Sequence, residues 1–233
     1  LYPFYFRDLA SRIEEVYYSY CIRASLFSPH KNMERLILTV TGPSGSGKTE
    51  LVRELCDKHS FAKLISVTTR PKRPGEIEGQ DYYFISEEEF IQLERNKGLA
   101  QEAVFNGFRY GTTVAELERV SALGKIPIVI VEPGGIPQFE RIANEYGYKL
   151  LTIFIEAEGK TLIKRYLSRI STGEKLDRLE YHARRIAAIS DELKWKDSWD
   201  FDMCFHNNSD DLADISRFAN IIGEFCGQSR NAA

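Results

Sequence analysis

The residues best suited to chemistry form one glycine-rich stretch, Gly42-Pro43-Ser44-Gly45-Ser46-Gly47-Lys48-Thr49, which matches the pattern G-x-x-x-x-G-K-[ST]. It follows an apolar run over 36–40 and precedes a helix predicted from Thr49 to about Cys56. In that setting the glycines let the backbone curl so that N–H groups point at phosphate oxygens. Lys48 would reach the terminal phosphates and the hydroxyl of Thr49 would bind Mg²⁺. The alternative is a tight glycine turn with an exposed lysine. The predicted ATP-binding residues are Gly42, Ser44, Gly45, Ser46, Gly47, Lys48 and Thr49.

A second cluster of basic and hydroxyl side chains follows a strand candidate at 63–67. Arg70 and Arg73 are three residues apart, so their two guanidinium groups can converge on one phosphate. Ser66, Tyr82 and Tyr110 could complete such a cage with hydroxyl donors. The alternative interpretation is a solvated basic loop.

Two phosphate sites imply transfer of a phosphoryl group between them. A phosphate oxygen is already anionic at neutral pH, so the transfer needs alignment and charge neutralisation rather than a general base. This agrees with the sequence, in which we find no Ser/His/Asp arrangement. The four histidines are scattered, so a metal site built from them is not expected.

The order of predicted elements indicates an α/β fold. Apolar, β-branched runs at 126–131 and 150–155 are typical of buried parallel strands. Helical patterns at 114–123, 137–146, 159–169, 179–193 and 212–226 lie between or after them. Between Val67 and about Leu123, short strands at 82–85, 103–105 and 108–110 predict a small inserted lobe, with Asn106-Gly107 as a hairpin turn.

Composition limits the class of protein. The chain has 233 residues and a net charge of −3, which argues against nucleic acid as a partner. It contains no run of about eighteen apolar residues, so no membrane span is expected. Four widely spaced cysteines favour buried free thiols in a reduced, cytoplasmic protein.

Residues 1–32 differ from the rest of the chain. Leu9, Ile13, Val16, Tyr17 and Tyr20 follow helical spacing, and 28–32 read as a linker. The predicted helical extension either covers part of the core or forms an interface with a protein partner or with the rest of a larger polypeptide. Because the chain begins at Leu1, a fragment or a processed product is one expectation.

The stretch 66–85 resembles the guanylate kinase family. The matching residues are Thr69, Arg70, Arg73, Glu76, Gly79, Tyr82 and Phe84, and with the phosphate loop the resemblance covers roughly residues 35–228. It implies a P-loop NTPase core with a parallel sheet flanked by helices, a small mixed α/β lobe that binds the nucleoside monophosphate, and a helical lid. The expected division is an extension at 1–32, a guanylate kinase-like domain at 33–228 and a tail at 229–233. Within the domain, the core is 33–65 and 124–228, the lobe 66–123 and the lid about 165–185.

The resemblance implies ATP-dependent phosphoryl transfer to a nucleoside monophosphate, with GMP or dGMP as the expected acceptor, and with Mg²⁺ and ATP as cofactors. Two alternatives are a related kinase with a different or broader acceptor and a non-catalytic protein-interaction module. The intact Gly47, Lys48 and Thr49 favour an enzyme.

The resemblance also implies roles for individual residues. Ser66, Arg70, Arg73, Tyr82 and Tyr110 match positions that hold the phosphate of the monophosphate. Thr112 matches a residue that faces the base. Arg165, Arg169 and Arg185 match lid arginines that close over the transferring group, and with Lys48 and Arg70 they are the expected catalytic residues.

Two positions depart from the family pattern. At the position of a glutamate that reads guanine, gapless register places Gln101, and Glu102 is one residue late. A β-bulge near Ala103 would turn Glu102 inward instead, so both residues stay candidates. At the end of a buried strand, Glu132 keeps the second of two acidic positions, where it would contact the base or a water bound to Mg²⁺.

Overall fold

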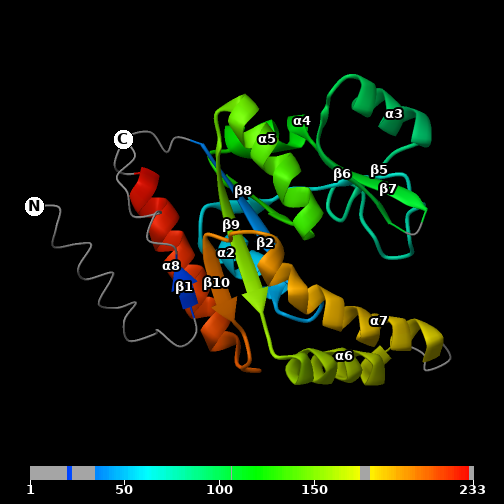
Figure 1. Ribbon diagram of the computed structural model, residues 1–233. Helices are drawn as coiled ribbons and strands as arrows, with labels where there is room; N and C mark the ends of the chain where they lie inside the picture. The colour runs from blue at the N-terminus through cyan, green and yellow to red at the C-terminus, as the bar shows by residue number, and fades with distance from the viewer. Residues whose placement is uncertain (1–19, 23–34, 106, 174–178, 231–233) are drawn as a thin grey trace, which may run out of the picture.

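The computed structural model describes residues 20–22, 35–105, 107–173 and 179–230 (Figure 1). A six-stranded sheet forms its centre. In sheet order the strands are β1 (Tyr20–Ile22), β10 (Met203–His206), β9 (Lys149–Glu156), β2 (Leu36–Thr41), β8 (Ile126–Ile130) and β3 (Phe61–Lys63). Neighbouring strands are parallel except β1, which runs antiparallel to β10. β2 runs parallel to both of its neighbours, β9 and β8, so the three strands end at the same edge of the sheet. The loop after β2 emerges at that edge, which is the usual place for a ligand. The predicted α/β fold is confirmed.

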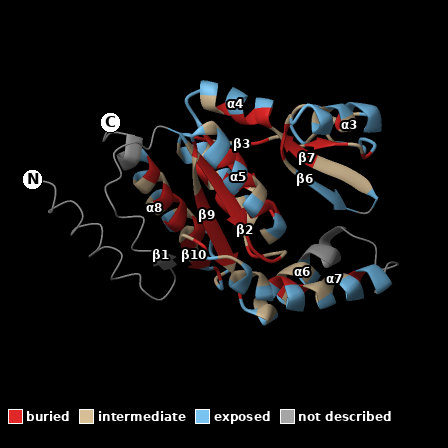
Figure 2. Ribbon diagram, turned by 45° about the horizontal axis from the view of Figure 1, so that its top comes forward, coloured by how far each residue is buried: buried red, intermediate tan, exposed pale blue. Residues whose placement is uncertain are grey.

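Helices cover both faces of this sheet. The helices α2 (Lys48–Lys58) and α8 (Leu212–Arg230) bury one face, and α4 (Val114–Ala122) and α5 (Ile136–Tyr146) bury the other. Figure 2 shows α8 on one side of the sheet and α4 and α5 on the other. Along β2 the side chains alternate, so that Leu38 and Val40 pack under α2 and α8 while Ile37 packs under α4 and α5. Each such buried side chain contributes about 1.5–3 kcal/mol. The strand that carries the phosphate loop is therefore held from both sides.

A second, four-stranded sheet forms the inserted lobe. Its strands in order are β5 (Tyr83–Phe84), β4 (Val67–Thr68), β7 (Phe108–Thr113) and β6 (Leu99–Phe105). Helix α3 (Glu87–Arg95) covers it through the fully buried Phe90. The sequence analysis did not predict α3. Its readable signal is a capping box, in which Ser86 and Glu89 each accept a hydrogen bond from the other's backbone N–H.

Helices α6 (Gly159–Gly173) and α7 (Leu179–Glu192) lie side by side, and exposed, half-buried and buried residues alternate along both (Figure 2). Tyr166 of α6 and Nδ1 of His182 in α7 share a 2.8 Å hydrogen bond that links the two helices. A 3₁₀ segment, η4 (Leu193–Ser198), returns the chain to the core, and another, η2 (Pro133–Gly135), follows β8. Within the described part of the chain, no helix has the length and apolar composition to cross a membrane.

Two predicted elements were wrong. The strand predicted at 63–67 is split between two sheets: the N–H of Leu64 still donates to Ile128 O (2.9 Å), but the N–H of Ile65 donates to the carboxylate of Glu116 (3.0 Å). The ladder ends there, and the chain crosses to β4. Tyr20 was assigned to an amphipathic helix but lies in β1, because Tyr20–Ile22 pairs with β10. The other residues of that helical pattern and the predicted linker lie outside the described residues.

Of the cysteines, Cys226 is buried, whereas Cys56 and Cys204 are only partly buried. The expectation of buried thiols therefore holds for Cys226 alone among these three.

The backbone at Gly42 comes unusually close to its neighbour, β9. A Cβ built on Gly42 would lie 2.1 Å from Ile155 O, and the residue has φ of 153°. Since backbone lines the contact, Gly42→Ala forces β2 and β9 apart. We expect the melting temperature to fall by at least about 5 °C. Gly227→Ala is the control, because its Cβ meets nothing within 4 Å on α8. A Gly42→Ala protein as stable as Gly227→Ala would contradict this account.

Candidate functional site

The phosphate loop runs from Gly42 at the end of β2 to Lys48 at the start of α2. Gly45 and Gly47 have φ of 88° and 106°, values in the left-handed region that favour glycine. The ammonium of Lys48 donates to Gly42 O (2.7 Å) and Pro43 O (2.8 Å), so it folds back over the loop. Two clefts meet here, and both are lined by Ser44 and Lys48.

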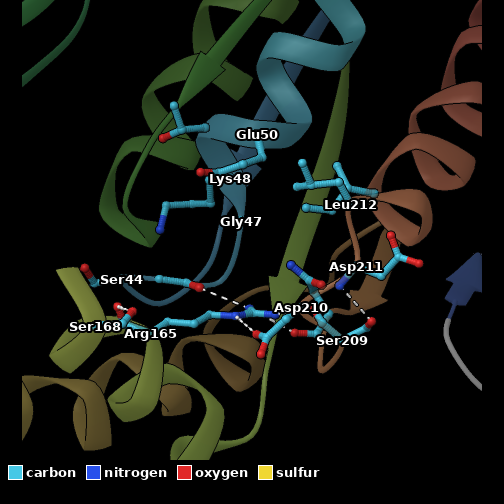
Figure 3. A pocket seen from close by; sticks show the side chains of 14 residues that line it. Ser44, Gly47, Lys48, Glu50, Arg165, Ser168, Ser209, Asp210, Asp211 and Leu212 are labelled. Atoms are coloured by element: carbon cyan, nitrogen blue, oxygen red, sulfur yellow. Dashed lines mark hydrogen bonds and ion pairs between the residues drawn. The ribbon is translucent and has the colours of Figure 1, made fainter. Parts of the chain in front are cut away.

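The outer cleft, of about 370 Å³, lies between the phosphate loop, α6 and the loop that follows β10 (Figure 3). Arg165 crosses its floor: Nη1 donates to Gly45 O (3.2 Å) and Asn207 O (3.1 Å), and Nη2 donates to Ser209 O. Asp210 contacts the Nε of Arg165 at 3.3 Å. Hydrogen bonds from Lys164 and then Arg165 hold the pKa of Asp210 below its usual range. Arg165 therefore connects three segments around the cleft.

Asn207, the residue that follows β10, supports the phosphate loop. Its Nδ2 donates to Ser46 O at 2.7 Å, and its side chain is buried. A Cβ on Gly47 would lie 2.5 Å from this same nitrogen, so glycine at 47 is required by packing as well as by φ. The sequence analysis missed Asn207, Ser209 and Asp210. The available signal was a polar run, 207–211, directly after an unassigned apolar strand.

The inner cleft, of about 740 Å³, lies between the phosphate loop and the lobe. All five residues predicted to hold the acceptor phosphate line it, namely Ser66, Arg70, Arg73, Tyr82 and Tyr110. Residues separated by more than forty positions in sequence therefore face one space.

Arg70 is the fixed cation of this cleft. Its side chain is buried, and its guanidinium makes two hydrogen bonds to Glu76, at 2.7 and 3.1 Å. The hydrogen bond from Arg70 is the main reason that the pKa of Glu76 is lowered, and Glu76 raises the pKa of Arg70. The ring of Tyr82 lies 5.5 Å from the guanidinium carbon, and burial raises the pKa of Tyr82. Arg73, in contrast, has an exposed side chain.

The pairing of β6 with β7 distinguishes Gln101 from Glu102. Gln101 is opposite Thr112 and Ala103 is opposite Tyr110, so these four residues share one face of the lobe sheet. A Cβ on Gly135, in the core, would lie 3.6 Å from Cγ of Gln101, so this face points toward the core. The Oγ1 of Thr112 is buried without a hydrogen-bond partner among the described residues. Gln101 lines the inner cleft, so a base that entered there would meet it, whereas Thr112 is fully buried behind it and does not line the cleft.

Glu102 belongs to the opposite face. Its partner across the ladder is Gly111, and its carboxylate lies 3.8 Å from Arg109 Nη2. The irregularity in β6 lies between Leu99 and Gln101, not near Ala103, and the pairing is regular from Gln101 to Phe105. The suggested bulge at Ala103 was therefore wrong. Glu102 still reaches the cleft rim, where its backbone N–H and C=O are held by the amide of Gln138 (2.9 and 3.1 Å).

Comparison with known proteins identifies the family. A family model described as guanylate kinase matches residues 33–221. The chain belongs to the guanylate kinase family. It is 35% identical over 173 residues to a guanylate kinase of Chlamydia pneumoniae, covering 71% of this chain and 82% of the relative. A guanylate kinase of Francisella tularensis subsp. holarctica (strain LVS) is 31% identical over 191 residues, with 80% and 96% covered. The crystal structure of guanylate kinase from Anaplasma phagocytophilum shares the fold, with a TM-score of 0.58 and 24% identity over 82% of this chain and 86% of that one.

The resemblance to guanylate kinases assigned three arginines to a lid, and the structure places them differently. Arg185 Nη2 donates to the hydroxyl of Ser44 at 3.0 Å, so Arg185 lies against the phosphate loop. Arg165 lies in the outer cleft, as described above. Arg169 is on α6, but its side chain lies outside what the structure describes.

The remaining predicted residues lie at the ends of elements near the loop. Glu132 is exposed after β8 and lines the inner cleft. Thr49 is exposed in the first turn of α2 and lines the outer cleft. Among the described residues no three acidic, His or Cys side chains are grouped as metal ligands. The donor set fits a Mg²⁺ held mainly by phosphate and water oxygens, with Thr49 as the protein ligand.

The burial and pairing of Arg70 predict that it contributes more to phosphate binding than Arg73 does. A hydrogen bond to a charged group contributes about 1.5–3 kcal/mol, so Arg70→Ala should weaken GMP binding roughly ten- to a hundredfold. Because Arg73 is exposed and solvated, Arg73→Ala should weaken it less than tenfold. Isothermal titration with GMP measures both.

Lys72→Ala is the matched control, since Lys72 is an exposed cation between the two arginines. Equal losses for Arg70→Ala and Lys72→Ala would show that the loop acts only through its net charge.

Proposed function

We propose that the protein transfers the terminal phosphoryl group of ATP to GMP, producing ADP and GDP, and that it also accepts dGMP. The observation that carries this proposal is the meeting of two clefts at Ser44 and Lys48. A triphosphate on the phosphate loop and a monophosphate held by Arg70, Tyr82 and Tyr110 would face each other across these two residues. The guanylate kinase relatives support the same assignment of donor and acceptor.

The chemistry proposed for this site is alignment and charge neutralisation. An oxygen of the GMP phosphate attacks the terminal phosphorus of ATP, the bond to the bridging oxygen breaks, and ADP leaves with that electron pair. The attacking oxygen carries negative charge at neutral pH, so no proton has to be removed by the protein. Lys48, Arg70 and Arg185 surround the place where the negative charge of both nucleotides gathers. Bound Mg²⁺ would neutralise part of the charge on ATP, with the hydroxyl of Thr49 as its protein ligand.

We assign residues 66–123 as the lobe that binds the monophosphate and the α6–α7 pair as the lid, including about 165–185. Closure of both parts would exclude water, which otherwise competes with GMP as acceptor. The open inner cleft supports this assignment, because it gives GMP access to the cage before closure.

For the base, we propose that Gln101 and Thr112 read guanine. The amide of Gln101 offers one acceptor and one donor, whereas a carboxylate accepts from both N–H groups on that edge of guanine. Preference for GMP over AMP should therefore be narrower than a glutamate at 101 would give. Glu132, at the rim, contacts the base or a water bound to Mg²⁺ in the same proposal.

The first test removes the cation over the phosphate loop. Lys48→Ala should lower kcat at least a hundredfold, because the charge that develops between the phosphates loses its compensation. Lys58→Ala is the control at the other, exposed end of α2 and should keep the wild-type rate. A coupled assay for ADP release measures both, with circular dichroism to verify folding. A wild-type rate for folded Lys48→Ala protein would refute the kinase assignment.

The second test compares the two candidates for base reading. Gln101→Ala should lower kcat/KM for GMP about tenfold and reduce the GMP/AMP ratio, since one or two hydrogen bonds are lost. Gln101→Glu should raise that ratio. Glu102→Ala should leave it unchanged, because its carboxylate lies beside Arg109. The assay uses GMP, dGMP, AMP and UMP. A GMP preference that depends on Glu102 alone would refute the assignment.

A further inference from the structure

Glu192 is a buried carboxylate that touches the phosphate loop and has no part in the reaction described above. It is the last residue of α7, and only 8% of it is exposed. Its Oε2 accepts a 2.6 Å hydrogen bond from the backbone N–H of Ser44. A buried carboxylate destabilises a protein unless hydrogen bonds and opposite charge compensate for its lost hydration. The burial of Glu192 therefore requires hydrogen-bond donors and a positive charge close to its carboxylate.

Arg185 provides the opposite charge. Residues 185 and 192 are seven apart, close to two full turns, so both side chains leave α7 on the same face. That face points at Ser44: Glu192 accepts from its N–H, while Arg185 donates to its hydroxyl at 3.0 Å. One loop residue is thus held at two atoms by one helix.

The contact between the two charges is long. Arg185 Nη1 lies 3.9 Å from Glu192 Oε1, beyond hydrogen-bond length. At that distance the carboxylate attracts the guanidinium without fixing its N–H groups on itself. About a third of the Arg185 side chain remains exposed, and both residues line the inner cleft with Lys48. Arg185 is therefore held beside the loop and stays accessible to an anion in the cleft.

We propose that Glu192 is a positioning residue for phosphoryl transfer: anchored on the Ser44 N–H, it holds Arg185 where the transferring phosphoryl group passes. This inference rests on the proposed kinase function. Glu192 itself touches no nucleotide and acts through Arg185. It contributes in the transition state, when charge passes between the two phosphates, more than in the binding of either nucleotide.

The test is a double-mutant cycle. Glu192→Gln keeps an oxygen that accepts from Ser44 N–H but removes the charge that attracts Arg185. In the wild-type background it should lower kcat about tenfold, with the KM values for ATP and GMP within about twofold. In the Arg185→Ala background the same change should alter kcat less than twofold, because the residue it positions is gone.

Asp191→Asn is the matched control: it removes the neighbouring carboxylate of α7, which is exposed and pairs with Lys194. It should leave kcat unchanged.

Melting temperatures distinguish positioning of Arg185 from a purely structural role. If Glu192 only held the phosphate loop to α7, Glu192→Gln would lower the melting temperature or raise KM both with and without Arg185. Equal fold losses of kcat with and without Arg185 would overturn the proposal, as would unchanged kcat in Glu192→Gln. If the wild-type chain fails to phosphorylate GMP, the proposed function fails first and this inference fails with it. If the wild type is active but the kcat losses of Glu192→Gln and Arg185→Ala are independent of each other, only the role of Glu192 is refuted.

Discussion

The close approach of Gly42 to the carbonyl of Ile155 determines where the phosphate loop leaves the sheet. With no Cβ at 42, β2 and β9 stay in contact up to the first residue of the loop. The turn that follows is then placed within reach of three segments distant in sequence. Asn207 supports it from below, Arg165 from the outer cleft, and Glu192 with Arg185 from the base of α7. These hydrogen bonds hold the loop from three sides without a nucleotide, an arrangement suited to a template for phosphate.

Three of the arginines around the clefts share one arrangement. Arg70 is paired with Glu76, Arg165 with Asp210 and Arg185 with Glu192. The chain as a whole is slightly acidic, at −3, and each of these three arginines lies beside a carboxylate. The pairs differ in strength. Arg70 is bound by two hydrogen bonds and stays with its partner, whereas Arg185 is held at a distance that leaves it free to turn toward an anion. The inner cleft is thus lined by one arginine that is bound closely to its carboxylate and by one that is bound loosely.

The parts of the site that sequence reasoning found are those written in continuous stretches. The loop 42–49 and the segment 66–85 carry their chemistry in local spacing, and β6 and β7, which are neighbours in sequence, pair so that Gln101 lies opposite Thr112. The residues it missed reach the loop only through the fold. Ser44 and Glu192 are 148 positions apart, and Ser46 and Asn207 are 161 apart. Neither Glu192 nor Asn207 stands in a sequence motif. Each contacts the loop through a hydrogen bond to one backbone atom, and such a contact leaves no local pattern in the sequence. The strand predicted at 63–67 failed for a related reason, since a carboxylate from α4 captures the N–H of Ile65.

The short strand β1 has a consequence for how the molecule meets its neighbours. The family match begins at residue 33, but the sheet does not end there: Tyr20–Ile22 lies along β10 in antiparallel register. A chain shortened to the matched residues would leave the N–H and C=O groups along that side of β10 without strand partners. Open edges of this kind recruit other strands, and self-association follows. Residues 20–22 therefore cover this side of β10, and their removal would make β10 the edge strand of the sheet.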